Sequence, residues 1–129
     1  MVFMFLNGGA MRDGPLHGKL CGAAFVAETY STPSYRFYSV DGRFPAMDPV
    51  DGPAGRRVAG EVYDVSLEIL HDSLLPAEPA ELELGVIRLA SGAASLAMIL
   101  RRSLRGDPSL VDISEIGSWR AYRAAGTSP

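Results

Sequence analysis

Two consecutive glycines, Gly8 and Gly9, follow a short apolar run near the start of the chain. Because glycine has no side chain, consecutive backbone N–H groups in such a loop can approach an anion such as a carboxylate. The lysine and hydroxyl side chains of a P-loop are missing, so the sequence disfavours nucleotide binding. A carboxylate-binding loop and a plain tight turn both stay open as interpretations.

The stretch VAGEVYDV at residues 58–65 is a second candidate for chemistry. Strand alternation places Glu61 and Tyr63 on one face. If that face points inward, a carboxylate is buried beside a phenol, an environment that changes its acidity. If the sheet faces the other way, Glu61 is an ordinary solvated carboxylate.

Three glutamates crowd the proline-rich stretch LLPAEPAELELG at residues 74–85: Glu78, Glu81 and Glu83. Rigid prolines could hold Glu78 or Glu81 at the mouth of a pocket as a general acid or base. Solvated loop charges are the alternative interpretation.

The chain has two histidines, His17 and His71, and neither has a second histidine at helical spacing. Motifs of the CxxC and HExxH type are also missing, and Cys21 is the single cysteine. The sequence therefore predicts no metal site and no cofactor. The pair formed by His71 and Asp72 is most simply the polar side of a helix.

Composition indicates one globular domain that spans residues 1–129. Hydrophobic residues make up 47% of the chain and charged residues 21%, which is typical of an ordered protein. The net charge of −3 and the scattered arginines disfavour nucleic acid as a partner. No apolar run reaches the length of a membrane span, and a single cysteine fits a reducing interior. We expect an unprocessed, cytoplasmic protein.

The apolar pattern predicts six strands, at residues 2–6, 23–29, 35–40, 58–65, 82–89 and 94–100. The last two should form a hairpin through Ser91-Gly92, with the final, apolar strand in a central position. Residues 44–55 contain three prolines and two glycines and are expected to form a surface loop.

Three helices are predicted between these strands. A short one is expected near Pro15, and a longer one should begin after Ser66 and end at Pro76. The last should be capped by Asp112 or Ser114 and should dock its tryptophan on the body of the domain. This order favours an α+β fold with a mixed, barrel-like sheet.

Three stretches resemble the gamma-glutamylcyclotransferase-like superfamily: the start FMFLNGGAM, the strand GEVYDV and the segment LLPAEP after the next helix. Members of that superfamily open with a strand and a YGTL or YGSN loop, carry a GELY-type strand, and have a glutamate after the next helix. Along nearly its full length the chain more closely resembles the C-terminal domain of allophanate hydrolase, through TPSYRFYSV, LPAEPAELELGVIRL and DISEIGSWRAYRA.

The resemblance implies a small, mixed, partly closed β-barrel with flanking helices and a cavity at the end of the first strand. It implies that Glu78, or Glu81 in the alternative register, transfers a proton, and it makes His17 the candidate for a catalytic histidine. The opening loop would bind a substrate carboxylate through N–H groups, and further side chains would orient the substrate. The substrate-binding residues that the resemblance implies are those of the loop: Leu6, Asn7, Gly8, Gly9, Ala10 and Met11. Beside them we expect Glu61, and Tyr63 or Arg36 to orient the substrate.

Two departures from the resemblance matter. Asn7 stands at or beside the place of the loop tyrosine of the cyclotransferases. The sequence also lacks the Ser-Ser-Lys machinery of the amidase domain, so allophanate hydrolysis itself is not expected from these residues.

In allophanate hydrolase the C-terminal domain promotes loss of carbon dioxide from N-carboxycarbamate, or mainly supports assembly. The resemblance therefore implies a stand-alone domain that acts on, or binds, a carboxylated urea- or amide-like metabolite in urea or amide nitrogen catabolism, as a hydrolase or lyase. One alternative is a non-catalytic accessory or dimerisation module for a separate amidase. Another is a gamma-glutamyl cyclotransferase. The expected partners are a small anionic metabolite, an amidase and a second copy of the chain, but neither nucleic acid nor a membrane.

Overall fold

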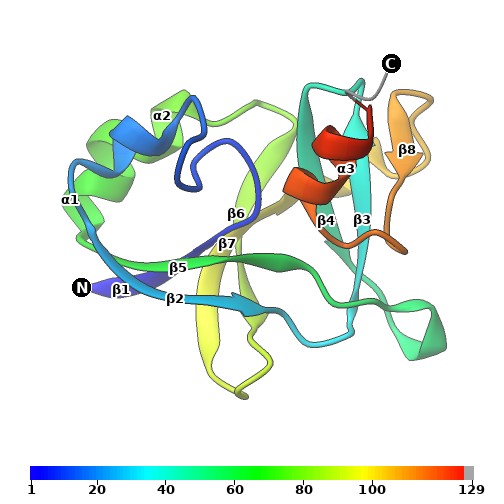
Figure 1. The fold of residues 1–129 in the computed structure, drawn as a ribbon, viewed down its shortest axis with the longest axis horizontal. Coiled ribbons are helices and arrows are strands. Elements are labelled where there is room, and N and C mark those ends of the chain that lie inside the picture. Colours follow the sequence, from blue (N-terminus) through cyan, green and yellow to red (C-terminus); the bar gives the residue numbers. More distant parts are fainter. Residues whose placement is uncertain (127–129) are drawn as a thin grey trace.

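The structure is a computed structural model that describes residues 1–126, and its strands form two sheets (Figure 1). One sheet has five strands in the order β2-β5-β1-β7-β6, and the other has three in the order β4-β3-β8. Strands β1 and β7 pair in parallel, whereas the other strand pairs are antiparallel. The class is therefore α+β with a mixed sheet, as predicted. The strands are β1 (Val2–Leu6), β2 (Ala24–Tyr30), β3 (Tyr35–Val40), β4 (Phe44–Pro49), β5 (Ala59–Val65), β6 (Leu82–Arg88), β7 (Ala94–Leu100) and β8 (Leu110–Asp112).

All six predicted strands are present, with ends that agree to within one residue. The hairpin between β6 and β7 is also confirmed, and Gly92 takes a φ of 95° in its turn. As expected for an apolar strand, β7 lies inside the sheet, between β1 and β6.

The prediction of a surface loop at residues 44–55 is wrong for its first half. Phe44–Pro49 forms β4, and Ala46, Met47 and Asp48 are buried. The prolines were misleading because β4 is an edge strand of its sheet. On the open side of an edge strand no neighbour needs an N–H donor, so proline is tolerated there. A short 3₁₀ turn, η2 (Gly52–Ala54), follows.

One helical segment precedes β2 in the chain, and another follows β5. The first, η1 (His17–Leu20), is the short helix expected near Pro15. The second begins after Ser66, whose Oγ accepts a hydrogen bond from the N–H group of Ile69 at 3.1 Å. It runs through α1 (Leu67–Ile69), the π-helical turn η3 (Leu70–Leu74) and α2 (Leu75–Ala77).

Pro76 does not end this helix, contrary to the prediction. The N–H group of Leu75 donates to the carbonyl of Leu70, five residues back, and this wide turn keeps the chain helical up to a proline that has no N–H to donate. The helix ends at Glu78, which is extended at ψ 148° because Pro79 disfavours helical geometry in the preceding residue.

The last helix, α3 (Trp119–Gly126), begins later than predicted. Asp112 lies in β8, opposite Tyr38 of β3, and the Ser114 hydroxyl accepts from the N–H group of Phe37. Neither residue therefore caps a helix. Ser118 does, because its Oγ accepts from the N–H group of Ala121 at 3.2 Å. The 3₁₀ turn η4 (Arg102–Leu104) precedes β8.

The two sheets meet where β4 packs against β7. In Figure 1 the α1–α2 segment lies toward one end of the molecule, and α3 lies toward the other, near β3 and β4. The edge strands β2 and β6 come together only at an isolated bridge between Ser31 and Leu89. The sheet is not closed among residues 1–126, so the predicted partly closed barrel is not confirmed. None of the helices in this range is long and apolar enough to cross a membrane.

Candidate functional site

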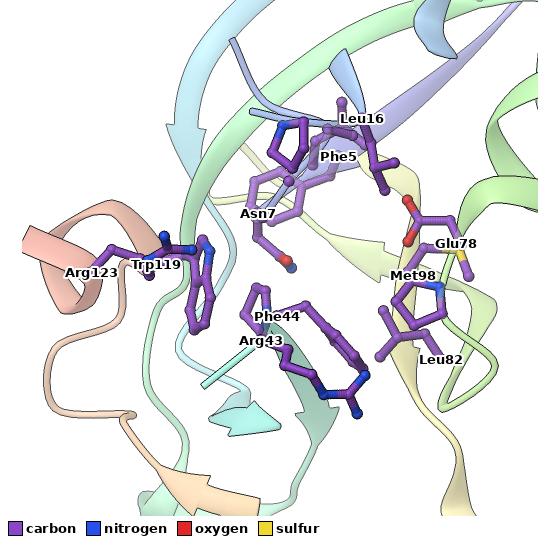
Figure 2. Close-up of a pocket in the computed structure, with 17 residues that line it drawn as sticks. Phe5, Asn7, Leu16, Arg43, Phe44, Glu78, Leu82, Met98, Trp119 and Arg123 are labelled. Atoms are coloured by element: carbon purple, nitrogen blue, oxygen red, sulfur yellow. The ribbon is translucent and has the colours of Figure 1, made fainter. Parts of the chain in front are cut away.

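A cavity of about 200 Å³ lies where the loop after β1 meets β4, α3 and the end of α2 (Figure 2). Its wall is largely apolar, with charged groups at Arg43, Glu78 and Arg123. Apolar surroundings with a few placed polar groups are typical of a small-molecule site. The lining residues are Phe5, Leu6, Asn7, Gly8, Gly9, Ala10, Pro15, Leu16, Arg43, Phe44, Pro45, Glu78, Pro79, Leu82, Met98, Trp119 and Arg123.

The loop after β1, residues 6–11, forms one wall of this cavity, and we call it the glycine loop. Its shape is set by backbone hydrogen bonds from Met11 to the Gly8 carbonyl, at 3.1 Å, and from Leu16 to the Gly9 carbonyl, at 2.8 Å. The N–H groups of Gly8, Gly9 and Ala10 have no acceptor among residues 1–126. Donors without an acceptor cost free energy unless water or a ligand satisfies them, so these N–H groups are left to bind water or a ligand.

Gly8 also brings this loop close to β4. A Cβ atom at position 8 would lie 2.7 Å from Cδ of Pro45, which is closer than packed carbon atoms approach. Gly9 is less crowded, because its nearest neighbour would be Cγ of Pro15 at 3.5 Å. Glycine at position 8 is therefore required by packing.

Glu78 is the acidic group of the cavity. The sharp end of α2 before Pro79 places its side chain beside Leu16 and Met98, with the carboxylate directed toward the cavity (Figure 2). This carboxylate has no hydrogen bond or ion pair to any other residue in the described part of the chain. Burial raises the pKa of Glu78 to about 7, so both protonation states are populated near neutral pH. That is the property required of a general acid or base.

Two arginines of the cavity were missed from the sequence. Arg43 forms an ion pair with Glu81, with 3.0 Å between Nη2 and Oε2. Arg123 lies over the indole ring of Trp119, with Cζ 5.8 Å from the ring centroid. The spacing of four residues between Trp119 and Arg123 was a usable signal, because it places both on one helix face. No local signal identifies Arg43.

Glu61 is completely buried and paired, and it lies outside the cavity wall. Its Oε1 accepts from the backbone N–H group of Arg12 and from the hydroxyl of Tyr63, both at 2.9 Å. Its Oε2 accepts from Nε of Arg12 at 3.0 Å and from Nη2 of Arg120 at 3.2 Å. The predicted inward orientation of Glu61 and Tyr63 is therefore confirmed.

The pKa values of Glu61 and Tyr63 follow from their contacts. Burial alone would raise the pKa of Glu61, but the hydrogen bonds from Arg12 and Tyr63 and the charge of Arg120 outweigh burial and lower it. Burial, followed by the hydrogen bond to Glu61, raises the pKa of Tyr63 to about 12. Glu61 is thus an anion that ties the glycine loop, through Arg12, to α3, through Arg120.

His17 also contacts the glycine loop from outside the cavity wall. Its Nδ1 lies 3.0 Å from the carbonyl oxygen of Ala10, and because a carbonyl only accepts, Nδ1–H is the donor. The imidazole edge packs against the ring of Tyr63 at 5.6 Å between centroids. The catalytic role of His17 stays a prediction.

Three other predicted residues also lie outside the cavity wall. Met11 is buried in the core, and Glu81 forms the ion pair with Arg43. Arg36 binds Asp112, with 2.6 Å between Nη2 and Oδ2, and so joins β3 to β8. The predicted residues that the fold brings to the cavity are Leu6, Asn7, Gly8, Gly9, Ala10 and Glu78.

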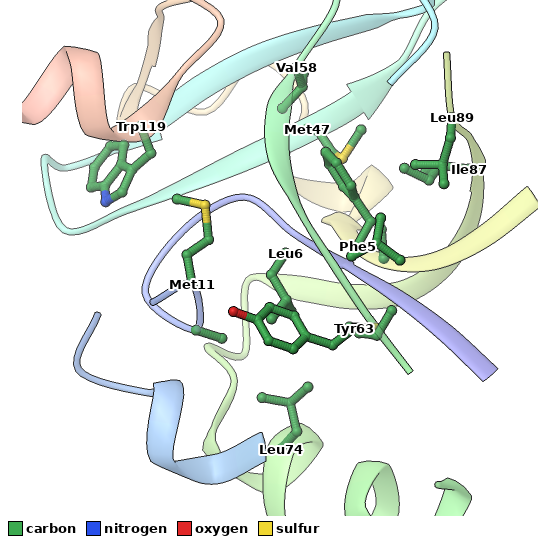
Figure 3. Close-up of a cluster of buried hydrophobic side chains, with 14 of the residues drawn as sticks. Phe5, Leu6, Met11, Met47, Val58, Tyr63, Leu74, Ile87, Leu89 and Trp119 are labelled. Atoms are coloured by element: carbon green, nitrogen blue, oxygen red, sulfur yellow. The ribbon is translucent and has the colours of Figure 1, made fainter. Parts of the chain in front are cut away.

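Both ends of the glycine loop pack into the hydrophobic core (Figure 3). Leu6 and Met11, at the two ends of the loop, are buried with Tyr63 of β5 and Leu74 of the helical segment. Trp119 of α3 belongs to the same cluster. The loop is therefore held by packing at both ends. No group of three or more His, Cys, Asp or Glu side chains within residues 1–126 is arranged to hold a metal ion.

Known proteins resemble this chain over nearly its full length. The yeast Saccharomyces cerevisiae urea amidolyase is 27% identical over 121 residues, which are 89% of this chain and 6% of that protein. A uropathogenic E. coli-specific protein of known structure is 31% identical with a TM-score of 0.85, covering 99% of this chain and 98% of its own.

Two further structures share the fold. Kluyveromyces lactis allophanate hydrolase superposes with a TM-score of 0.90 at 23% identity, over 98% of this chain and 21% of that enzyme. A Mus musculus AIG2-like protein superposes with a TM-score of 0.59 at 19% identity, over 77% of this chain and 76% of its own. Residues 2–124 match the allophanate hydrolase C-terminal domain family, and the chain belongs to that family.

Proposed function

We propose that the cavity binds a small carboxylated urea- or amide-like metabolite and that Glu78 transfers a proton to it. The observation that carries this proposal is the environment of Glu78: a half-buried carboxyl, unpaired among residues 1–126, with a pKa of about 7, that shares a cavity with N–H groups that have no acceptor in the same range. A positioned acid with a pKa near the working pH is an efficient catalyst.

N-carboxycarbamate is the substrate that family membership suggests. One of its carboxylates would accept hydrogen bonds from the loop of Gly8, Gly9 and Ala10. Protonated Glu78 would donate its proton to the nitrogen as the bond from nitrogen to the second carboxyl carbon breaks. The bonding electrons stay on nitrogen, carbon dioxide leaves, and carbamate remains. The proton is then replaced from solvent.

Membership in this family supports a role in urea or allophanate breakdown. The chain corresponds to only 6% of urea amidolyase and 21% of allophanate hydrolase, so the activity of those whole enzymes is not transferred. Within the proposal, a separate amidase supplies the substrate. We assign His17 the role of supporting the loop through Ala10, and proton transfer by His17 is the alternative that a His17→Ala variant tests.

The test couples this protein to an allophanate-specific amidase, which releases ammonia and forms N-carboxycarbamate. Membrane-inlet mass spectrometry follows release of carbon dioxide. The wild-type protein should accelerate that release, and Glu78→Gln should lower the accelerated rate by a factor of about a hundred or more. Glu83→Gln is the matched control, because Glu83 and its partner Arg101 both lie outside the cavity wall, and it should leave the rate unchanged.

A binding role without turnover is the second candidate, because the predicted catalytic histidine does not line the cavity. Malonate, in which CH₂ replaces the NH of N-carboxycarbamate, is a stable probe for it. Binding of malonate without acceleration would establish an accessory module, whose partner would be the amidase or a second copy of the chain. Failure of both assays overturns the proposal. Gamma-glutamyl cyclotransfer is checked by the appearance of 5-oxoproline from gamma-glutamyl peptides, and nothing in the cavity favours it.

A further inference from the structure

We infer that Arg123 binds a second carboxylate of the ligand, so that the cavity selects short dianions over monoanions of the same shape. This inference rests on the proposed function, because it assumes that the glycine loop holds the first carboxylate. It concerns a residue at the opposite side of the cavity from Glu78, as Figure 2 shows.

Among residues 1–126, Arg123 is the cavity cation without an anionic partner. The other cation, Arg43, has its Nη2 3.0 Å from Oε2 of Glu81 and 4.0 Å from Oδ2 of Asp41. The guanidinium of Arg123 forms no ion pair and no hydrogen bond within residues 1–126. Its charge is therefore available to a ligand, whereas that of Arg43 is already balanced.

The position of Arg123 is determined by the anchoring of α3. Trp119, four residues earlier, is buried and stacks on Tyr122 with 5.3 Å between ring centroids. Arg120 holds the same turn through the Glu61 carboxylate and the Arg12 carbonyl, at 3.2 Å and 2.7 Å. Because residues four apart share a helix face, Arg123 lies over the Trp119 ring at the cavity wall.

Charge balance then indicates the class of ligand. Burial raises the pKa of Glu78 to about 7, so near neutral pH this group offsets at most part of the Arg123 charge. The loop of Gly8, Gly9 and Ala10 adds N–H donors that have no acceptor among the described residues. Two separate groups of donors in a cavity of about 200 Å³ fit one small ligand that carries two anionic ends.

Malonate and malonamate test this inference, because they have the same shape and differ by one charge. Calorimetry at neutral pH should show that the wild-type protein prefers malonate by at least about tenfold, as expected for a hydrogen bond to a charged group. Arg123→Gln should lower the affinity for malonate by a similar factor and leave that for malonamate unchanged. Circular dichroism and thermal unfolding confirm that the variant is folded.

Arg57→Gln is the matched control. Arg57 also lies over an aromatic ring, with Cζ 4.9 Å from the Tyr30 centroid, but it is outside the wall of this cavity. Its replacement should leave both affinities unchanged. Equal binding of the two probes by the wild-type protein, or an unchanged preference in Arg123→Gln, overturns the inference while the carboxylate site of the proposed function stands. If neither probe binds, the inference is overturned, and the carbon dioxide assay then decides whether the proposed function stands.

Discussion

Glu78 couples the chemistry of the cavity to the stability of the fold. Its pKa of about 7 lies above the ordinary value of 4.5 because burial disfavours the charged form. The folded state therefore holds this proton more tightly than the unfolded state does. The resulting contribution to the free energy of unfolding is complete below about pH 4.5 and is lost as the pH rises through about 7.

Glu78→Gln should therefore stabilise the protein at alkaline pH while it removes activity. Urea unfolding at about pH 8 should give a free energy of unfolding that is higher than wild type by on the order of 3 kcal/mol at most, with little difference at about pH 4. Glu81→Gln breaks the partly exposed ion pair with Arg43 and should cost about 0–1 kcal/mol at about pH 8. A Glu78→Gln effect that did not depend on pH would show that the wild-type carboxyl has an ordinary pKa.

Glu61 is a stabilising anion, and a neighbouring glutamate offers a control. Glu61→Gln should lower the free energy of unfolding by about 1–3 kcal/mol, because it weakens bonds to two arginines at a buried position. Glu28 binds the same Arg12 at 3.3 Å, but its side chain is 70% exposed. Glu28→Gln should therefore change stability by less than about 0.5 kcal/mol. Equal losses for the two variants, measured by denaturant unfolding, would contradict the role assigned to Glu61.

The lowered pKa of Glu61 gives this residue a pH dependence opposite to that of Glu78. Because its folded-state pKa lies below the ordinary value of 4.5, its contribution to the free energy of unfolding is present above about pH 4.5. It is lost as the pH falls through the lowered pKa. Acid unfolding of Glu61→Gln should accordingly be less steep than that of the wild-type protein.

At the scale of elements, the glycine loop is defined by its contact with β4. Gly8→Ala would place Cβ against the rigid ring of Pro45, at 2.7 Å, and should cost about 1–3 kcal/mol of stability. Gly9→Ala meets only ordinary contacts at 3.5 Å and should be within about 0.5 kcal/mol of wild type. The added methyl group would narrow the cavity, because Gly9 lines it, so Gly9→Ala should nevertheless weaken malonate binding. Similar stabilities of the two variants would contradict the assigned packing.

The elements also show where sequence patterns are informative. The six strands were recognisable because apolar residues alternate or run continuously within them. The prolines at positions 45 and 49 concealed β4, since a sequence does not show which strand will lie at a sheet edge. The start of α3 was misplaced because Asp112 and Ser114 are good capping residues that instead bind β3.

At the scale of the whole molecule, the cavity depends on the docking of α3. Trp119 is buried in the main core cluster, so Trp119→Ala should cost about 3–5 kcal/mol. It should also lower the affinity for malonate by about as much as Arg123→Gln does, because Arg123 loses the ring beneath it. Ile116→Ala, in the same segment, removes a side chain that is 46% exposed and should change stability by no more than about 0.5 kcal/mol. Denaturant unfolding and calorimetry check both variants, and an affinity for malonate in Trp119→Ala equal to that of the wild-type protein would separate α3 from the site.

The amino-acid sequence by itself determined six of the eight strands in residues 1–126, the glycine loop and the glutamate before Pro79, because each depends on residues that are neighbours along the chain. It also determined family membership, through motifs spread over residues 2–124. Only the tertiary structure decided which charges meet. Arg43 and Arg123 are 80 positions apart in numbering yet line one cavity with Gly8 and Glu78, whereas Glu61 and His17 lie outside its wall. Burial and pairing set the acidity of a carboxylate, and both arise only when distant segments pack together.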